Sequence, residues 1–229
     1  MTAPIRIISS MATRQVLADL ITRFEQRSTQ KVVVESVGGV DAAKRVRAGE
    51  AFDAIVLASN VIDDLAREGH VLAGSRTDLV HSGVAVAVRE GAPRPDIRTA
   101  DAVRAAVLAA RSISLSTGPS GVALAKLFER WGIVEAIAPR MVQAPPGVPV
   151  GRLVAEGQVE LGFQQLSELM HLKGITVLGP LPPEIQITTT FSAGVASTAA
   201  QPEAVRALLR DLASPAAAEI KQRHGMEPA

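Results

Sequence analysis

Hydrophobic residues along the chain follow two alternating spacings. Short runs of aliphatic and β-branched residues at 5–8, 31–34 and 52–58 have the length and composition of strands. Between these runs, apolar residues recur every three or four positions, as in helices that cover one face of a sheet. The run at 52–58 is mostly apolar, which is typical of a strand buried on both faces of a parallel sheet. Because strands and helices keep alternating towards the C-terminus, the pattern predicts an α/β protein with parallel sheets.

The stretch 112–133, SISLSTGPSGVALAKLFERWGI, contains the clearest junction between a strand and a helix. Its first four residues alternate in polarity like a half-buried strand, and its apolar residues from 122 onwards have helical spacing. The turn between them predicts a helix capped by Ser120, with free backbone N–H groups near Gly121. Such a helix start attracts a carboxylate or an oxyanion through its N–H groups and its dipole, without help from a basic side chain.

Three other junctions carry similarly small or hydroxyl-bearing residues: Ser9 with Ser10, Gly38 with Gly39, and the segment 147–151. Ligands of open α/β sheets bind outside the carboxyl ends of the strands. If two lobes bring the four junctions together, the cleft between the lobes becomes a cage of backbone amides and hydroxyls. Such a cage suits a small oxyanion or a polycarboxylate.

The composition restricts the partners of the chain. Its 229 residues carry 24 basic and 23 acidic side chains, a formal net charge of +1, so no strong field attracts nucleic acid or a membrane surface. The chain has no cysteine, and its four histidines lack the spacing of metal ligands. No run reaches the ~18 apolar residues that a membrane span needs. We therefore expect a small anionic ligand, and no metal, cofactor, nucleic acid or membrane insertion.

The N-terminus shows no secretory leader. No basic segment followed by a continuous apolar run and a cleavage site precedes the first strand. As the sequence stands, we expect a cytoplasmic protein, and if Met1 replaces a removed leader, the expectation changes to the periplasm.

Six segments spread over nearly the whole chain resemble one family, the molybdate-binding type of periplasmic solute-binding protein. They are ISSMATRQVLADLITRFEQ, VGGVDAAKRVRAGEAFDAIVLAS, SGVAVAV, STGPSGVALAKLFERWGI, VGRLVAEGQVELGFQQLSEL and SPAAAEIKQRHGMEP. The resemblance implies a two-lobed α/β fold of the type 2 class, with a ligand cleft between the lobes. It places residues 1–81 and 187–229 in lobe 1 and residues 82–186 in lobe 2. It also implies the membrane subunits of an ABC transporter as partners.

The resemblance further implies a set of ligand-binding positions. The family holds a tetrahedral oxyanion with a hydroxyl of the first loop, a serine of the second loop, backbone amides of two lobe 2 helices, and a tyrosine. By position these correspond to Ser9 or Ser10, Gly38 or Gly39, the amides near Gly121 and Val150, and Gln165.

Two of these positions depart from the family pattern. Glycine replaces the serine of the second loop, and Gln165 replaces the tyrosine, so the site loses donors and gains room. An amide both donates and accepts hydrogen bonds, which suits a larger ligand with carboxylates. The segments GFQQLSEL and GPLPPEIQ also resemble a branch of the superfamily that includes aconitate isomerase.

The roles of several other polar side chains near the junctions follow less directly from the sequence. Arg14, at the start of the first helix, either binds a carboxylate through its planar guanidinium group or lies on the surface in contact with solvent. Arg152 opposes the dipole of its helix unless an anion compensates it. His81 lies at a polar break in a long strand, and is either a general base or a hinge histidine satisfied by the backbone. Ser167 and Glu168 are interpreted as a cap of the next turn.

Two functions of different classes remain open. One is a receptor that closes two lobes over a small oxyanion or a di- or tricarboxylate and delivers it to an ABC transporter. The other is a soluble isomerase that moves a proton along an allylic tricarboxylate. The missing leader favours the isomerase, whereas the lack of an evident acid/base pair favours the receptor.

Overall fold

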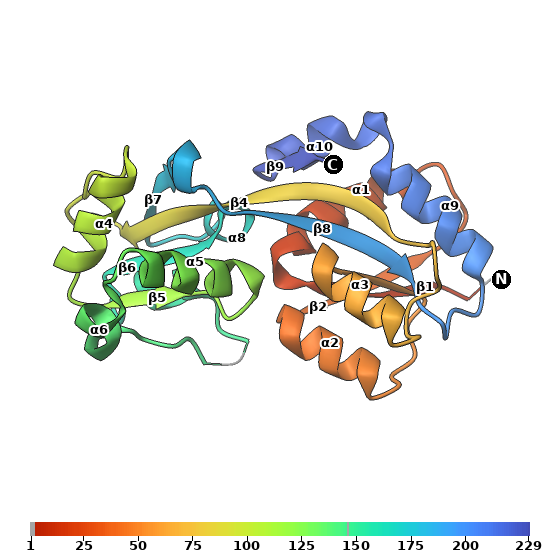
Figure 1. Cartoon of the computed structure of the whole chain (residues 1–229). Helices are drawn as coiled ribbons and strands as arrows, with labels where there is room; N and C mark the ends of the chain where they lie inside the picture. Colours follow the sequence, from red (N-terminus) through yellow and green to blue (C-terminus); the bar gives the residue numbers. More distant parts are fainter. Residues whose placement is uncertain (1–2, 146) are drawn as a thin grey trace. The chain divides into compact units, whose positions relative to one another are not determined.

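The computed structural model describes residues 3–145 and 147–229 and divides into two compact units (Figure 1). Unit 1 comprises the chain up to His81 together with Thr190–Ala229, and unit 2 comprises Ser82–Thr189. The chain passes between the units within the two long strands β4 (Thr77–Arg89) and β8 (Thr188–Val195). The lobe boundaries expected from the sequence lie at 81/82 and 186/187, so the observed return lies slightly further along the chain.

Unit 1 contains a mixed sheet with the strand order β2-β1-β3-β8-β4. Strand β1 is parallel to β2 and β3, whereas β8 is antiparallel to β3, and the short C-terminal strand β9 pairs with β4. The remaining elements of this unit are β1 (Ile5–Ser10), the 3-10 helix η1 (Met11–Thr13), α1 (Arg14–Glu25), β2 (Val32–Val37), α2 (Gly39–Arg47), β3 (Ala54–Ala58), α3 (Ser59–Arg67), α9 (Pro202–Ala213), η4 (Pro215–Ala217), α10 (Ala218–Arg223) and β9 (Met226–Pro228).

Helices cover both faces of the unit 1 sheet, and β3 shows how its residues are divided between them. Ala54 and Val56 belong to the core under α1, α9 and α10, whereas Ile55 and Leu57 belong to the core under α2 and α3. All four are buried, as the continuous apolar run of this strand predicts. Full burial of an aliphatic side chain contributes roughly 1.5–3 kcal/mol to folding stability, so β3 stabilises the helix layers on both faces of the sheet.

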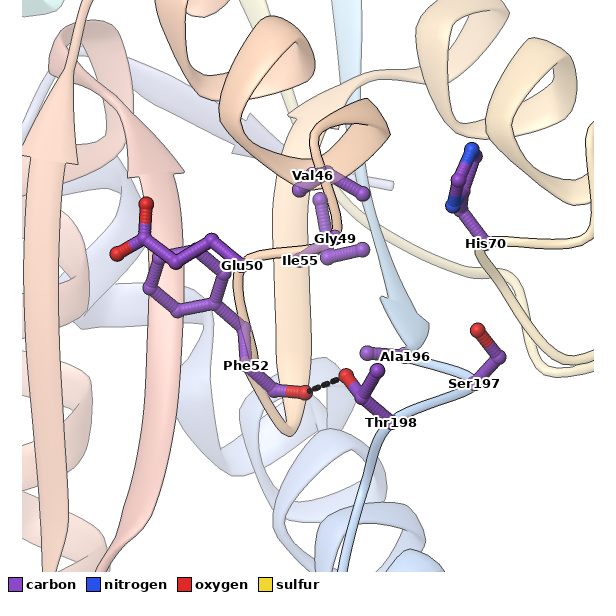
Figure 2. A pocket seen from close by; sticks show the side chains of 9 residues that line it. All are labelled: Val46, Gly49, Glu50, Phe52, Ile55, His70, Ala196, Ser197 and Thr198. Atoms are coloured by element: carbon purple, nitrogen blue, oxygen red, sulfur yellow. Dashed lines mark hydrogen bonds between the residues drawn. The ribbon is translucent and has the colours of Figure 1, made fainter.

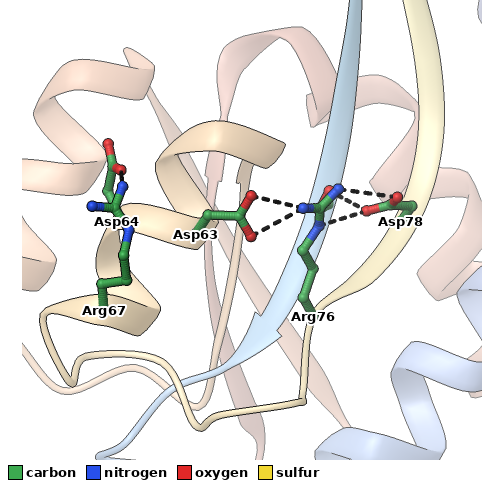
Figure 3. Close-up of polar contacts among 6 residues, drawn as sticks. Asp63, Asp64, Arg67, Arg76 and Asp78 are labelled. Carbon is green, nitrogen blue, oxygen red and sulfur yellow. Dashed lines mark hydrogen bonds and ion pairs between the residues drawn. The ribbon is translucent and has the colours of Figure 1, made fainter.

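Arg76 connects helix α3 to the start of β4 within unit 1 (Figure 3). Its Nη1 lies 2.7 Å from Asp63 Oδ2, and its Nε lies 2.9 Å from Asp78 Oδ1. Asp78 also accepts a hydrogen bond from Ser192 Oγ on β8 at 2.6 Å. Burial opposes the ionisation of Asp78, but Arg76 and Ser192 outweigh it and lower its pKa. These charges stabilise the unit at the point where β4 begins.

Unit 2 contains a second mixed sheet, in which β4 is antiparallel to β6 on one side and to β7 on the other, and β6 is parallel to β5. Its remaining elements are α4 (Ala100–Ala109), β5 (Ile113–Leu115), α5 (Pro119–Arg130), α6 (Val134–Ile137), η2 (Ala138–Arg140), α7 (Val150–Ala155), β6 (Leu161–Gln165), α8 (Leu166–Leu169), β7 (Ile175–Pro180) and η3 (Pro183–Ile185).

The core of unit 2 also has two sides. Val84 and Val86 of β4 pack with Phe163 and the apolar faces of α4 and α5, whereas Ala85 and Ala87 pack with α8. None of the helices that the structure describes is long and apolar enough to cross a membrane.

The prediction of parallel sheets is only partly correct, because both units also contain antiparallel strand pairs. Strand β4 leaves unit 1 and β8 returns to it, so the two strands run in opposite directions, and each is antiparallel to neighbours in its sheet. The long strand expected around His81 is present as β4, which continues through the polar residues there. His81 Nδ1 lies 2.9 Å from the hydroxyl of Thr190, so the expectation of a histidine satisfied by the backbone is wrong. Met1, on which the expectation about a leader depends, lies outside the described residues.

Candidate functional site

The carboxyl ends of three parallel strands meet at one edge of the unit 1 sheet. At this edge Ser9 is fully buried, and its Oγ lies 2.7 Å from Oγ of Ser36 on the neighbouring strand. The hydroxyl of Ser10 caps η1 by accepting a hydrogen bond from Ala12 N at 3.3 Å. Because Ser10 Oγ acts there only as an acceptor, its O–H can still donate to a ligand. Ser10 is therefore better placed than Ser9 to bind an anion.

Helix α2 begins beside Ser10. Its N-cap is Gly38, which provides no side-chain cap, so N–H groups of the first turn remain available. A Cβ atom added to Gly39 would lie 3.8 Å from Ser10 Oγ, which shows that the two junctions adjoin. One carboxylate oxygen of Asp41 lies 3.3 Å from the corresponding position on Gly38. We call Ser10, Gly38, Gly39 and Asp41 the unit 1 cluster.

Arg14 is the first residue of α1 and is exposed. No ion pair joins it to another side chain in 3–145 or 147–229. Both expectations for Arg14, that it binds a carboxylate or that it only contacts solvent, therefore remain predictions.

In unit 2 the turn after β5 adopts a different cap from the one predicted. Helix α5 begins at Pro119 with Gly118 as its N-cap, and Ser120 does not cap it. Instead Ser120 Oγ lies 2.9 Å from Ser116 Oγ inside the turn. A Cβ atom on Gly121 would lie only 1.6 Å from the carbonyl oxygen of Ser116, so glycine is required for this close approach. The junction is a compact turn whose shape depends on Gly121.

The neighbouring strand β6 ends in two glutamines that point to different partners. Gln164 is 3% exposed, and its Oε1 accepts a hydrogen bond from Gly151 N near the start of α7 at 2.9 Å. Its Nε2 donates to Glu168 Oε1 at 2.8 Å. Burial raises the pKa of Glu168 to about 7, and the hydrogen bond from Gln164 opposes that rise only in part. Glu168 therefore bonds Gln164 and is not the side-chain cap of α8 that we expected.

Gln165 is also 3% exposed, and its amide lies among residues of the crossing strands. With the amide oriented so that both of its polar atoms are satisfied, the nitrogen donates to Ser82 Oγ at 2.8 Å and the oxygen accepts from Thr189 Oγ1 at 2.9 Å. The same nitrogen lies 3.2 Å from the carbonyl oxygen of Gly83. Gln165 thus links β4, β6 and β8 within unit 2.

Val150 is the first residue of α7, as expected, and Arg152 in the same helix pairs with Glu156 at 2.8 Å. Because this exposed pair compensates the charge of Arg152, no anionic ligand is needed to explain the arginine. No group of three or more metal-binding side chains occurs within the described part of the chain.

A small pocket lies at the other edge of the unit 1 sheet, beside the first residues of β3 (Figure 2). Phe52, His70 and Thr198 are among its lining residues, and Thr198 Oγ1 donates to the Phe52 carbonyl at 2.7 Å. Its volume of about 30 Å³ leaves room for only a few water-sized molecules. This pocket is too small for a polycarboxylate and lies away from the carboxyl ends of the parallel strands.

A profile of bacterial extracellular solute-binding proteins matches residues 5–227. The chain belongs to this family. Aconitate isomerase from a Pseudomonas species is 35% identical over 228 residues, which cover 97% of this chain and 87% of that protein.

Solved structures of other solute-binding proteins share the fold. The periplasmic molybdate-binding protein of Azotobacter vinelandii matches with a TM-score of 0.79 and 18% identity, covering 97% of this chain and 98% of its own. The sulfate-binding protein of Mycobacterium tuberculosis matches with a TM-score of 0.80 and 17% identity, covering 100% of this chain and 88% of its own. The family resemblance and the two-lobed α/β fold expected from the sequence are thereby confirmed.

The structure brings some predicted site residues together within each unit. Ser10 adjoins Gly39 in unit 1, and in unit 2 the ends of β5 and β6 place the turn at Gly121 and Gln164 at the same edge of the sheet. Asp41 was not among the residues predicted from the sequence, and its position in the first turn after the two glycines was the available signal. Sequence reasoning also missed the role of Gln164 between Gly151 and Glu168.

Proposed function

We propose that this solute-binding protein binds an unsaturated tricarboxylate and interconverts its cis and trans isomers. The observation that carries the proposal is the 35% identity to aconitate isomerase along 97% of the chain. The departures from the oxyanion-binding pattern agree with it, since Gly39 leaves space beside Ser10 where a serine side chain would stand. A tricarboxylate needs such space and accepts hydrogen bonds from the hydroxyl and N–H groups of the unit 1 cluster.

The reaction is a proton shift along an allylic system. A base removes one proton from the methylene carbon next to the double bond, and the electron pair spreads over the allylic carbons and the neighbouring carboxylate. A proton is then returned to the former vinyl carbon, the double bond moves by one position, and no atom is gained or lost. N–H and O–H donors stabilise the charge that develops on the carboxylate oxygens.

We assign the proton transfer to Asp41. Its carboxylate lies at the unit 1 cluster, and no ion pair occupies it among the side chains that the structure describes. Asp41 lies in the first turn of α2, where a carboxylate stabilises the helix in a receptor and in an isomerase alike. Beside a bound anion the same charge weakens binding by repulsion, which a simple anion receptor does not need. An isomerase, by contrast, needs a base at that position. The Asp41→Asn variant should therefore bind the tricarboxylate and fail to isomerise it.

The second candidate function is a receptor that passes a small anion to an ABC transporter. The membership in the bacterial extracellular solute-binding family favours it. In that case the protein binds its ligand without changing it, and Asp41→Asn strengthens binding because it removes a repulsive charge.

Calorimetric titration tests the ligand class. We expect tricarballylate, a saturated tricarboxylate that has no double bond to shift, to bind more tightly than molybdate or sulfate. Tight binding of molybdate with no heat from tricarballylate or aconitate would refute the tricarboxylate proposal and favour an oxyanion receptor.

A further inference from the structure

Strand β2 forms one edge of the unit 1 sheet. It pairs with β1 in a continuous parallel register, and no second strand in the described part of the chain pairs with it. Ile5 N donates to the carbonyl oxygen of Lys31 at 2.8 Å, so the backbone groups of Lys31 point towards β1. Because successive residues of a strand direct their N–H and C=O groups to opposite sides, those of Val32, Val34 and Ser36 point away from β1. The outer edge of β2 therefore offers donors and acceptors to another strand.

This edge is regular and only partly covered. Glu25 Oε1 accepts a hydrogen bond from Val32 N at 2.9 Å. The Val34 N–H group and the Val32 carbonyl group have no side-chain partner within residues 3–145 and 147–229. Edge strands are commonly blocked by a proline or a β-bulge, and β2, with the sequence VVVESV, has neither. The strand is therefore open to pairing from the middle of its edge.

Three exposed side chains of alternate residues lie on one face of this edge: Lys31, Val33 and Glu35. Val33 is 55% exposed, the largest fraction among the large hydrophobic residues that the structure describes. Lys31 and Glu35 carry opposite charges and lie two residues before and two residues after Val33. The pattern is complementary to itself in an antiparallel pair. When Val33 lies opposite Val33 of a second copy, each Lys31 lies opposite a Glu35.

The same register also matches the backbone groups. It places Val34 opposite Val32 of the second copy, so Val34 N–H meets the carbonyl oxygen of Val32 once on each side of the two-fold axis. These two bonds leave Val32 N with its partner Glu25. Val33 then occupies a pair without hydrogen bonds, in which the Cα atoms of opposite residues are only about 4.5 Å apart. The two exposed valines cover each other.

The neighbouring charges favour this arrangement. Lys31 Nζ lies 3.0 Å from Glu25 Oε2, and Arg45 Nη2 lies 3.0 Å from Glu35 Oε2. The side chains of Lys31 and Glu35 nevertheless remain 68% and 48% exposed, so each can contact a second group. Across the pair of copies, the order Glu25, Lys31, Glu35, Arg45 alternates in sign. No like charges are brought together.

We propose that the chain forms a homodimer through antiparallel pairing of β2 with β2 of a second copy, centred on Val33. The unit 1 sheets of the two copies then form one continuous sheet. The occupant of the edge is a second copy because the charges on β2 complement themselves. This interface involves no ligand, so it is independent of the proposed function.

Sedimentation velocity of the full chain over a range of concentrations tests the proposal. The parent should show a monomer–dimer equilibrium that weakens as the salt concentration rises. Lys31→Glu places glutamate opposite glutamate, and Glu35→Lys places lysine opposite lysine, so each variant should dimerise at least about tenfold more weakly. An equimolar mixture of the two variants should dimerise again, because every such pair then joins a glutamate to a lysine.

Two lysine substitutions at exposed valines provide a matched comparison. Val33→Lys should abolish the dimer, whereas Val134→Lys, at a valine 41% exposed on α6, should sediment as the parent does. Melting of each variant within a few degrees of the parent shows that it is folded, since these positions are exposed. A parent that stays monomeric at every concentration, or a dimer that persists in Val33→Lys, would overturn the proposal. Failure of the mixture to dimerise, beside a parent that does, would overturn the register.

Discussion

Replacing Gly121 by alanine is the most direct perturbation of the junction between β5 and α5. The new Cβ would lie 1.6 Å from the carbonyl oxygen of Ser116, whereas a carbon and a carbonyl oxygen normally approach to about 3.3 Å. The obstacle is backbone and not the flexible end of a side chain, so α5 or the turn must move by more than about 1 Å. Overpacking of this kind costs about 1–3 kcal/mol, and we expect the upper end of that range.

The assay is thermal unfolding followed by circular dichroism. For a chain of this length each kcal/mol shifts the melting temperature by about 2–4 °C, so Gly121→Ala should melt about 6–12 °C below the parent.

The matched control is Gly118→Ala, three positions earlier in the same turn. No atom lies within 4 Å of a Cβ atom at Gly118, so the substitution changes only the N-cap, at a cost of about 1 kcal/mol. If the Gly121 and Gly118 variants melt within about 2 °C of each other, the close approach of Gly121 to Ser116 is not required, and our account of the turn is wrong.

Three further predictions concern other positions. Gly39→Val should reduce tricarboxylate affinity at least tenfold in calorimetry with a melting temperature within about 2 °C of the parent, since a Cβ there makes only ordinary contacts; unchanged affinity would remove this residue from the site. Gln165→Leu should lower stability by about 1–3 kcal/mol in urea unfolding because Thr189 and its other partners lose a buried hydrogen bond, and a stability equal to that of the parent would contradict the linking role. Lys221 is fully buried, and burial, with the charge of Arg23, lowers its pKa. The charged form of Lys221 therefore destabilises the folded protein. This destabilisation is complete below the lowered pKa and disappears as the pH rises towards the ordinary pKa of 10.5. Lys221→Met should raise the melting temperature by about 2–4 °C at pH 7 and by less near pH 10, and a pH-independent difference would refute this reading.

The sequence predicts the junctions of this fold better than the direction of its strands. The continuous apolar run that ends at Ala58 and the glycine at 121 each have a direct counterpart in the structure, because burial on two faces and a close backbone approach both limit which residue is possible. The antiparallel direction of β4 and β8 has no such signal. A strand that passes between the units has the same apolar composition as a parallel strand. Its direction depends on which element follows it in the chain.

Some neighbours within the candidate site could be predicted from the sequence, but its hydrogen bonds could not. Small residues at the strand ends indicate an anion site, and Ser10 does adjoin Gly39. The partners of Ser120 and Glu168 depend on side chains that are close in space because of the turn, so their hydrogen bonds to Ser116 and Gln164 could not be assigned from spacing alone. The buried environment that raises the pKa of Glu168 also becomes visible only when α7 packs against α8.

Proton NMR of trans-aconitate incubated with the protein in deuterated buffer at neutral pH tests the central claim most directly. Our account predicts that the signals of cis-aconitate appear and grow to a constant ratio with the trans isomer, and that Asp41→Asn abolishes this change while it still binds tricarballylate. An unchanged spectrum after long incubation, with tricarballylate binding intact in the parent, would contradict the isomerase and leave the protein a receptor.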